Sequence, residues 1–268
     1  MELIEKLTQI AYDAMLCFNE KIETNFTSEN TVLVFFTPKT GAKVYEEMCK
    51  QYFPNRLTQE YKRKGYFNTF LAQAFVGKDK YGILMRSDIN LPTKEWFHII
   101  LHELSHIYCT TNEIEDGHFY DKYCLNYAED SIIDGYINSG YAVWRECIAD
   151  IMANSINPYF YGYELVDLKD ELHRLIKCIV PFADEAKQCM SLILAYIMTS
   201  KEGYATETWV ELDTVIRNLK VFKNEQIYDV VHYVYENLHK TPYWGIDINF
   251  IEQLGFKYLM LCTTNFTS

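Results

Sequence analysis

The spacing of apolar residues predicts an amphipathic helix and then a buried strand at the start of the chain. Between Glu2 and about Asn19, apolar residues recur at helical spacing, as on one helix face: Leu3, Leu7, Ile10 and Ala14. Residues 31–36 form a β-branched and aromatic run that ends before Pro38, which is typical of a buried strand. A short helix is expected to follow at about residues 42–52.

Two more strands and a second helix are predicted in the next part of the chain. Residues 66–88 contain two apolar or mixed segments separated by the polar turn 77–80, which indicates two strands joined by a turn. Residues 81–86 are the second of these strands. Thr93 is then a suitable N-cap for a helix, because Glu95 would lie in the first turn, where the macrodipole favours a carboxylate.

Beyond Pro158 the apolar residues recur almost entirely at helical spacing. Four core-facing stripes are expected, over residues 168–179, 190–198, 209–219 and 227–238. We therefore predict an α+β fold, with a small N-terminal mixed sheet and its helices followed by a largely helical C-terminal sub-domain. The expected division places the candidate chemistry in residues 1–157 and a helical sub-domain that closes the cleft in residues 158–268.

The composition is that of a folded globular chain, and its charge excludes one class of partner. Of the 268 residues, 49% are hydrophobic and 23% are charged, an ordinary globular balance. The formal net charge of −12 argues against nucleic acid as a partner, because phosphate binding requires a basic surface. The short basic run at residues 61–64 is interpreted as a solvated loop.

Neither export nor membrane insertion is expected. The N-terminal residues 1–7 are charged and helically patterned, without the apolar segment and cleavage site of a signal peptide. The most apolar stretch, residues 190–198, is much shorter than the roughly 20 residues of a spanning helix. The eight cysteines are scattered without close pairs, so we expect reduced thiols in a cytoplasmic protein. No oligomeric state is predicted.

The segment His102-Glu103-Leu104-Ser105-His106 carries the candidate chemistry. Four residues correspond to about 400° of rotation and about 6 Å of rise along a helix, so the two imidazoles project from one face and can bind one zinc ion. Glu103 points beside this ion, where its carboxylate can remove a proton from water bound to the metal. Ligand and general base are therefore separate residues.

A catalytic zinc ion usually has three protein ligands and one open position, so a third ligand is required downstream. Glu146 is the leading candidate, because it lies on a segment with helical apolar spacing. Asp150 follows one turn later, where its carboxylate could accept the outer N–H of a ligand histidine and fix the tautomer. Glu225, with Asp229 one turn later, has the same spacing and stays open as an alternative, as does the acidic loop with Glu113, Glu115 and Asp116.

His-Glu-x-x-His followed by Glu-x-x-Ala-Asp resembles the gluzincin metallopeptidases, over about residues 80–155. The resemblance implies a zincin-like fold in which His102, His106 and Glu146 bind zinc. It also implies that Glu103 is the general base and that Asp150 orients a ligand histidine. In that group an edge strand precedes the active-site helix and holds the extended substrate, which by resemblance would be Ile83 to Arg86.

The chain departs from this group in the connection between the second histidine and the glutamate. Residues 107–145 are longer than in the thermolysin-like enzymes and rich in tyrosine and acidic residues, which suggests ordered structure. A tyrosine or histidine usually donates a hydrogen bond to the tetrahedral intermediate. The sequence does not select this donor among its candidates, which are His118, Tyr120, Tyr136, Tyr141 and His232.

Two functions are compatible with this pattern. The first is a zinc metallopeptidase that acts on a peptide or protein, with Glu103 transferring the proton from water to the leaving amine. The second is a non-catalytic metal-binding or regulatory module that retains the fold. A closed structural site would need a fourth ligand such as Cys109 or Cys147, whereas it has no use for the base Glu103.

Overall fold

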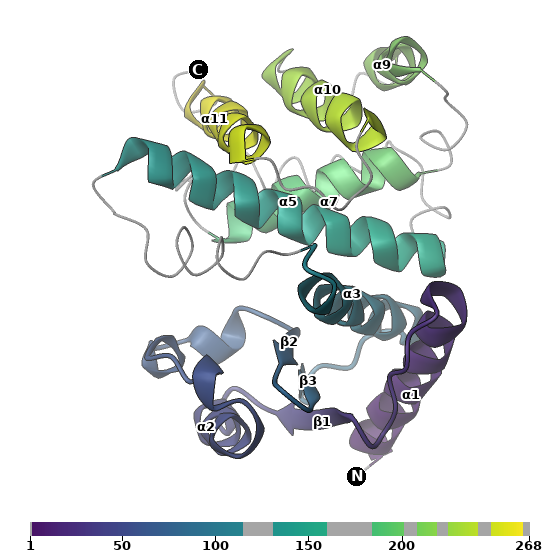
Figure 1. The fold of residues 1–268 in the computed structure, drawn as a ribbon, viewed down its shortest axis with the longest axis vertical. Helices are drawn as coiled ribbons and strands as arrows, with labels where there is room; N and C mark the ends of the chain where they lie inside the picture. Colours follow the sequence, from purple (N-terminus) through teal and green to yellow (C-terminus); the bar gives the residue numbers. More distant parts are fainter. Residues whose placement is uncertain are drawn as a thin grey trace. The chain divides into compact units, whose positions relative to one another are not determined.

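A computed structural model describes the fold over residues 2–114, 131–159, 184–200, 208–218, 225–240 and 248–264. The chain divides into two units, Met1–Thr111 and Asn112–Ser268. The first contains a small mixed sheet with helices and the described part of the second is helical, which confirms the predicted α+β class (Figure 1). The functional division at residue 157 stays a prediction, because compactness alone does not test it.

The first unit contains three helices and three strands besides short 3-10 turns between residues 54 and 68. In chain order they are α1 (Glu2–Ile22), β1 (Thr31–Phe36), α2 (Gly41–Tyr52), β2 (Ala72–Val76), β3 (Tyr81–Arg86) and α3 (Thr93–Thr111). Each of these elements was predicted from the apolar pattern. The spacing of apolar residues was sufficient to predict them because each element has an apolar pattern typical of a helix or a strand and is bounded by polar residues.

The three described strands form a sheet in the order β1-β3-β2. β1 runs parallel to β3, with Leu33 opposite Ile83, and β2 pairs with β3 in the antiparallel direction. The expectation that Ile83–Arg86 is an edge strand is therefore wrong, because β3 has a partner on both sides. The uninterrupted apolar run Ile83, Leu84 and Met85 is consistent with this position, since a central strand covered on both faces loses the alternation of apolar and polar residues.

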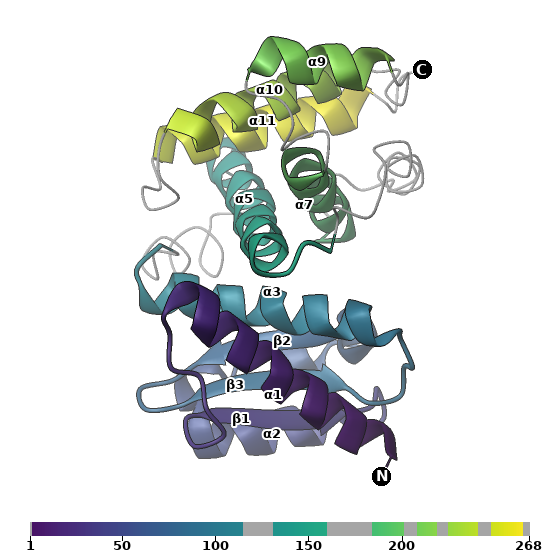
Figure 2. The same cartoon turned by 90° about the vertical axis from the view of Figure 1, so that its right-hand side faces the viewer.

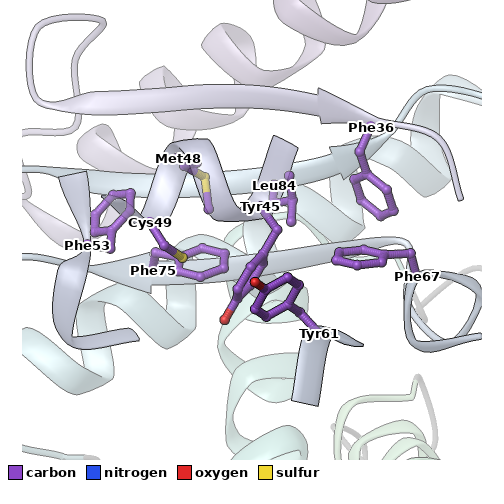
Figure 3. Packing of buried hydrophobic residues seen from close by; sticks show 9 residues of the cluster. All are labelled: Phe36, Tyr45, Met48, Cys49, Phe53, Tyr61, Phe67, Phe75 and Leu84. Carbon is purple, nitrogen blue, oxygen red and sulfur yellow. The ribbon is translucent and has the colours of Figure 1, made fainter. Parts of the chain in front are cut away.

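The sheet separates two layers of helices in this unit. α2 lies on one side, and α1 and α3 lie on the other (Figures 1 and 2). Between α2 and the sheet is a cluster rich in aromatic rings, seen in Figure 3, which consists of Phe36, Tyr45, Met48, Cys49, Phe53, Tyr61, Phe67, Phe75 and Leu84. Burial raises the pKa of the Tyr45 phenol, whose hydroxyl donates a hydrogen bond to the carbonyl of Arg56 at 2.7 Å.

The second unit is built around one long helix, α5 (Ile132–Ile156). Ser131 caps its first turn by accepting a hydrogen bond from the backbone N–H of Asp134. α5 packs against α7 (Asp184–Thr199) and α11 (Ile248–Thr264), as Figures 1 and 2 show. α9 (Trp209–Asn218) and α10 (Glu225–Lys240) complete the described helices of this unit.

Most of these helices coincide with predicted stripes, and α11 does not. The stripes at 190–198, 209–219 and 227–238 coincide with α7, α9 and α10, whereas the stripe at 168–179 lies outside the described residues. α11 was not singled out in the sequence. Its buried residues Ile251, Leu254 and Tyr258 do have helical spacing, so the signal was present.

Two glycines allow α5 and α11 to approach until their backbones touch. A Cβ atom on Gly140 would collide with the carbonyl of Ile251, and a Cβ atom on Gly255 would collide with the carbonyl of Tyr136. Each glycine therefore faces the main chain of the opposite helix. No other residue type fits at either position without separating the helices.

Of the helices that the structure describes, none has both the length and the apolar character that a membrane crossing requires. The cysteines with described side chains, Cys17, Cys49, Cys109 and Cys147, are all free thiols.

We expect Gly140→Ala to lower the free energy of unfolding by about 2–3 kcal/mol, because the new methyl group must push α11 away from α5. Urea denaturation followed by circular dichroism measures this change. The neighbouring Ser139→Ala is the control, since the buried Ser139 hydroxyl has no hydrogen-bond partner among the described residues and its loss should not destabilise the protein. Equal stability of the wild type and Gly140→Ala would show that the two backbones are not in contact.

Candidate metal centre

α3 presents its histidines on the side opposite its main apolar stripe. Ile100, Leu104 and Ile107 are fully buried and lie about 140–200° around the helix from His102. α3 packs against β2 and against α1, where the ring of Tyr108 lies 6.1 Å from that of Phe18. Packing on these faces fixes the rotation of α3 and therefore the direction of its histidines.

The two histidines already direct their side chains to a common point. His102 Nε2 and His106 Nε2 are 3.0 Å apart, and the rings meet edge to face with centroids separated by 4.6 Å. His106 is only 3% exposed and His102 is partly buried. Two nitrogens that bind one ion at about 2.0–2.1 Å in tetrahedral geometry lie about 3.3 Å apart, so little adjustment is needed.

Glu103 is buried beside this pair. Its side chain is 8% exposed, and it lies about 60° around α3 from His106 and about 100° from His102. Glu103 therefore lies beside the face of α3 that carries the two histidines and not on it. Its position on the helix is therefore compatible with a base and differs from that of the two possible ligands.

α5 carries the two acidic residues that the sequence selected. Glu146 lies near the middle of the helix and its carboxylate is 3.4 Å from the guanidinium of Arg145. Asp150 follows one turn later and is buried. Arg145 was not among the predicted site residues, although a cation directly beside a candidate ligand is visible in the sequence.

His102, His106 and Glu146 form one group that could hold a metal ion. Each offers one ligand atom, and within the described part of the chain these three atoms all lie within 4.8 Å of one another. Two imidazoles and one carboxylate are three protein ligands, which leaves a coordination position open, as in catalytic metal sites. The group is also the set of ligands that the sequence predicted.

The other candidate ligands do not belong to this group. Glu225 begins α10, is 78% exposed and accepts a hydrogen bond from Arg217 at 2.8 Å. Glu113 is exposed in the turn after α3. Glu115 and Asp116 lie outside the described residues.

The two cysteines considered for a closed site are also outside the group. Cys109 and Cys147 are buried on α3 and α5 respectively, and neither belongs to the metal-binding group. Burial raises the pKa of the Cys147 thiol, and the nearby carboxylate of Asp150 raises it further. A bound metal ion would displace this proton, so the position of the thiol, and not its pKa, places Cys147 outside the group.

The candidate hydrogen-bond donors for a reaction intermediate are dispersed. Tyr141 is buried with its ring tilted against that of Trp144, and helical geometry places it about 140° around α5 from Glu146. Tyr136 contacts Phe256 of α11. His232 stacks on Trp209 with ring centroids 4.4 Å apart, and His118 and Tyr120 lie outside the described residues. The donor therefore stays unassigned.

We predict that the purified protein binds about one divalent metal ion per chain through this group. Free metal at 100 times its dissociation constant should raise the free energy of unfolding by about 2.7 kcal/mol, because only the folded chain assembles the three ligands. Elemental analysis and thermal unfolding with Zn²⁺, Co²⁺, Ni²⁺ and Mn²⁺ measure stoichiometry and stabilisation.

Matched substitutions separate this site from incidental binding. His106→Ala and Glu146→Gln should lose the stabilisation by metal. His232→Ala and Glu225→Gln should keep it, because these residues have the same chemistry and lie outside the group. Equal metal binding by His106→Ala and the wild type would exclude the proposed ligand set.

The chain was compared with protein-family models, curated proteins and solved structures. No family model, curated protein or solved structure matches the chain. The resemblance to gluzincins therefore depends on the residues at positions 102–106 and 146–150 alone, and the chain's own geometry carries the argument for a metal site.

Proposed function

We propose that this protein is a zinc-dependent metallopeptidase that hydrolyses peptide bonds in a peptide or protein substrate. The observation that carries the proposal is the group formed by His102, His106 and Glu146, whose ligand atoms lie within 4.8 Å of one another. Glu103 adds a base next to the two histidines on the same helix. A binding site for metal alone would not require that fourth residue.

Zinc is the proposed metal because the available ligands suit it. Two imidazole nitrogens and one carboxylate oxygen are a known ligand set for catalytic zinc, and hard cations such as Mg²⁺ prefer ligand sets made entirely of oxygen. When bound, zinc supplies Lewis acidity, which polarises a substrate carbonyl and lowers the pKa of water to about 7. The remaining steps belong to the residues of the chain.

Glu103 is proposed to move the proton. Its carboxylate would accept a proton from the attacking water and then return it to the amine that leaves when the peptide bond breaks. Its burial favours this role, because a carboxylate shielded from bulk water exchanges its proton with a bound reactant more selectively. The adjacent His102 and His106 bind the ion through nitrogen and are not needed as bases.

Asp150 is proposed to act on the ligands and not on the substrate. In the gluzincin arrangement, a carboxylate one turn after the ligand glutamate accepts the outer N–H of a ligand histidine. Such a hydrogen bond fixes the tautomer and strengthens the metal-binding nitrogen. Asp150 has the required position on α5 and is buried, as a residue in this role should be.

The rival function is a non-catalytic metal-binding module. It shares the three ligands and differs in having no use for Glu103. The absence of Cys109 and Cys147 from the metal-binding group weighs against a closed four-ligand site among the described residues. Peptide hydrolysis that depends on Glu103 distinguishes the two functions directly.

We expect Glu103→Gln to keep zinc and lose peptide hydrolysis by about 10²–10⁴-fold, because the amide preserves size and cannot accept the proton. The measurement combines zinc content with the cleavage rate of a diverse peptide library, followed by mass spectrometry. Glu95→Gln is a matched control on the same helix, since Glu95 lies in the first turn of α3.

The result is decisive in both directions. Loss of cleavage with full zinc content supports the general base, and an unchanged rate for Glu95→Gln shows that the loss is local. A zinc-loaded wild-type protein that cleaves no peptide in the library, or that cleaves equally well with Glu103→Gln, would contradict the peptidase and leave the non-catalytic module.

A further inference from the structure

We propose that Lys187 and Asn154 are positioning residues which hold α5 at the rotation that directs Glu146 to the metal. The inference rests on the proposed function, because it takes Glu146 as the third ligand. It concerns two buried polar side chains that join α5 to α7 and that have no part in the peptidase mechanism.

Glu146 lies midway between two hydrogen-bonding positions on α5. Asn138 precedes it by eight residues and Asn154 follows it by eight. Helical geometry places Asn138 about 80° around the helix on one side of Glu146 and Asn154 about 80° on the other, each about 12 Å away along the axis. The two asparagines therefore flank the direction in which Glu146 points.

Both asparagines are bonded to the same neighbouring helix. The ammonium group of Lys187 donates to Asn138 Oδ1 at 3.0 Å, and Asn154 Nδ2 donates to the carbonyl of Thr199 at 3.3 Å. Lys187 and Thr199 lie at opposite ends of α7, which packs beside α5 (Figures 1 and 2). Because both asparagines are bonded to α7, a rotation of α5 about its axis would displace both side chains from their partners and lengthen or misalign the two hydrogen bonds.

The burial of these groups indicates that their hydrogen bonds are required. Asn154 is 0% exposed, and Lys187 is 7% exposed, which is uncommon for a lysine. Removing an ammonium or an amide from water is unfavourable unless good hydrogen bonds replace the lost hydration. Thr199 is the last residue of α7, so its carbonyl has no partner within the helix and Asn154 supplies one.

A small rotation of α5 would be sufficient to disturb metal binding. A side-chain atom roughly 6 Å from the helix axis moves by about 1 Å when the helix turns by about 10°. Metal–ligand distances tolerate only about 0.2 Å. His102 and His106 constrain each other as neighbours on one helix, whereas Glu146 is the single member of the group on α5. Its direction therefore depends on what holds α5.

The test uses the full chain and the metals themselves. Lys187→Met keeps the apolar stem and removes the donor, and Asn154→Ala removes the second hydrogen bond. Each should weaken Zn²⁺ binding by about 10–100-fold, the usual effect of losing a group that orients a ligand. Competition with a chromophoric chelator measures the affinity. The visible spectrum of the Co²⁺-loaded protein should shift towards that of Glu146→Gln, and Lys187→Arg should restore both properties.

A control distinguishes positioning from general loss of stability. Leu194→Ala removes buried apolar contacts of α7 and leaves both hydrogen bonds in place. Below its unfolding temperature it should bind Zn²⁺ as the wild type does. In the Glu146→Gln background, Lys187→Met should cause no further loss of affinity, because the two substitutions remove the same metal–ligand contact.

The outcomes separate this inference from the proposed function. Wild-type affinity and Co²⁺ spectra in folded Lys187→Met and Asn154→Ala would overturn the positioning role, as would an equal loss of affinity in Leu194→Ala. Undiminished Zn²⁺ binding by Glu146→Gln would instead overturn the proposed ligand set. Weak binding in all three variants that lack Glu146, Lys187 or Asn154, with Leu194→Ala unaffected, supports both.

Discussion

The meeting of two imidazole nitrogens on α3 is the constraint on which the candidate site depends. His102 Nε2 and His106 Nε2 lie 3.0 Å apart because i, i+4 positions share one face of α3, and buried apolar residues on the far side of the helix fix the direction in which that face points. The sheet supports the helix through β2, and α1 covers another of its faces. The sheet and α1 of the N-terminal unit therefore support the turn of α3 that carries His102 and His106.

Much of this support could be predicted from the sequence because it is local. The i, i+4 spacing of His102 and His106 determines that both project from one helix face, whatever surrounds the helix. The order of the strands could not be predicted in the same way. Whether Ile83–Arg86 lies at the edge or in the centre depends on whether β3 pairs with β1 as well as with β2, and that choice is made by contacts between residues far apart in the sequence. The buried run at 83–85 was the available clue.

The third ligand illustrates an intermediate case. Helical spacing selected Glu146 and Asp150, and it selected Glu225 and Asp229 equally well. What distinguishes the two glutamates is their surroundings, since Glu225 is exposed at the start of α10, whereas Glu146 is partly buried and belongs to the metal-binding group. Asn138 and Asn154 belong to no sequence motif that would have singled them out. Their importance becomes visible only when α7 is placed beside α5, because a single ligand on a helix has no neighbouring ligand to fix its direction.

The contact between Gly140 and Gly255 is a constraint of the fold that is independent of the metal chemistry. A related protein that kept this helical arrangement would need glycine at both positions even after it had lost its histidines and its metal, because the backbones still touch. An unrelated protein that reached the same chemistry independently would share His-Glu-x-x-His and a distant glutamate without either glycine. The glycine pair is therefore a requirement of this helix packing, whereas the ligands are a requirement of holding an ion.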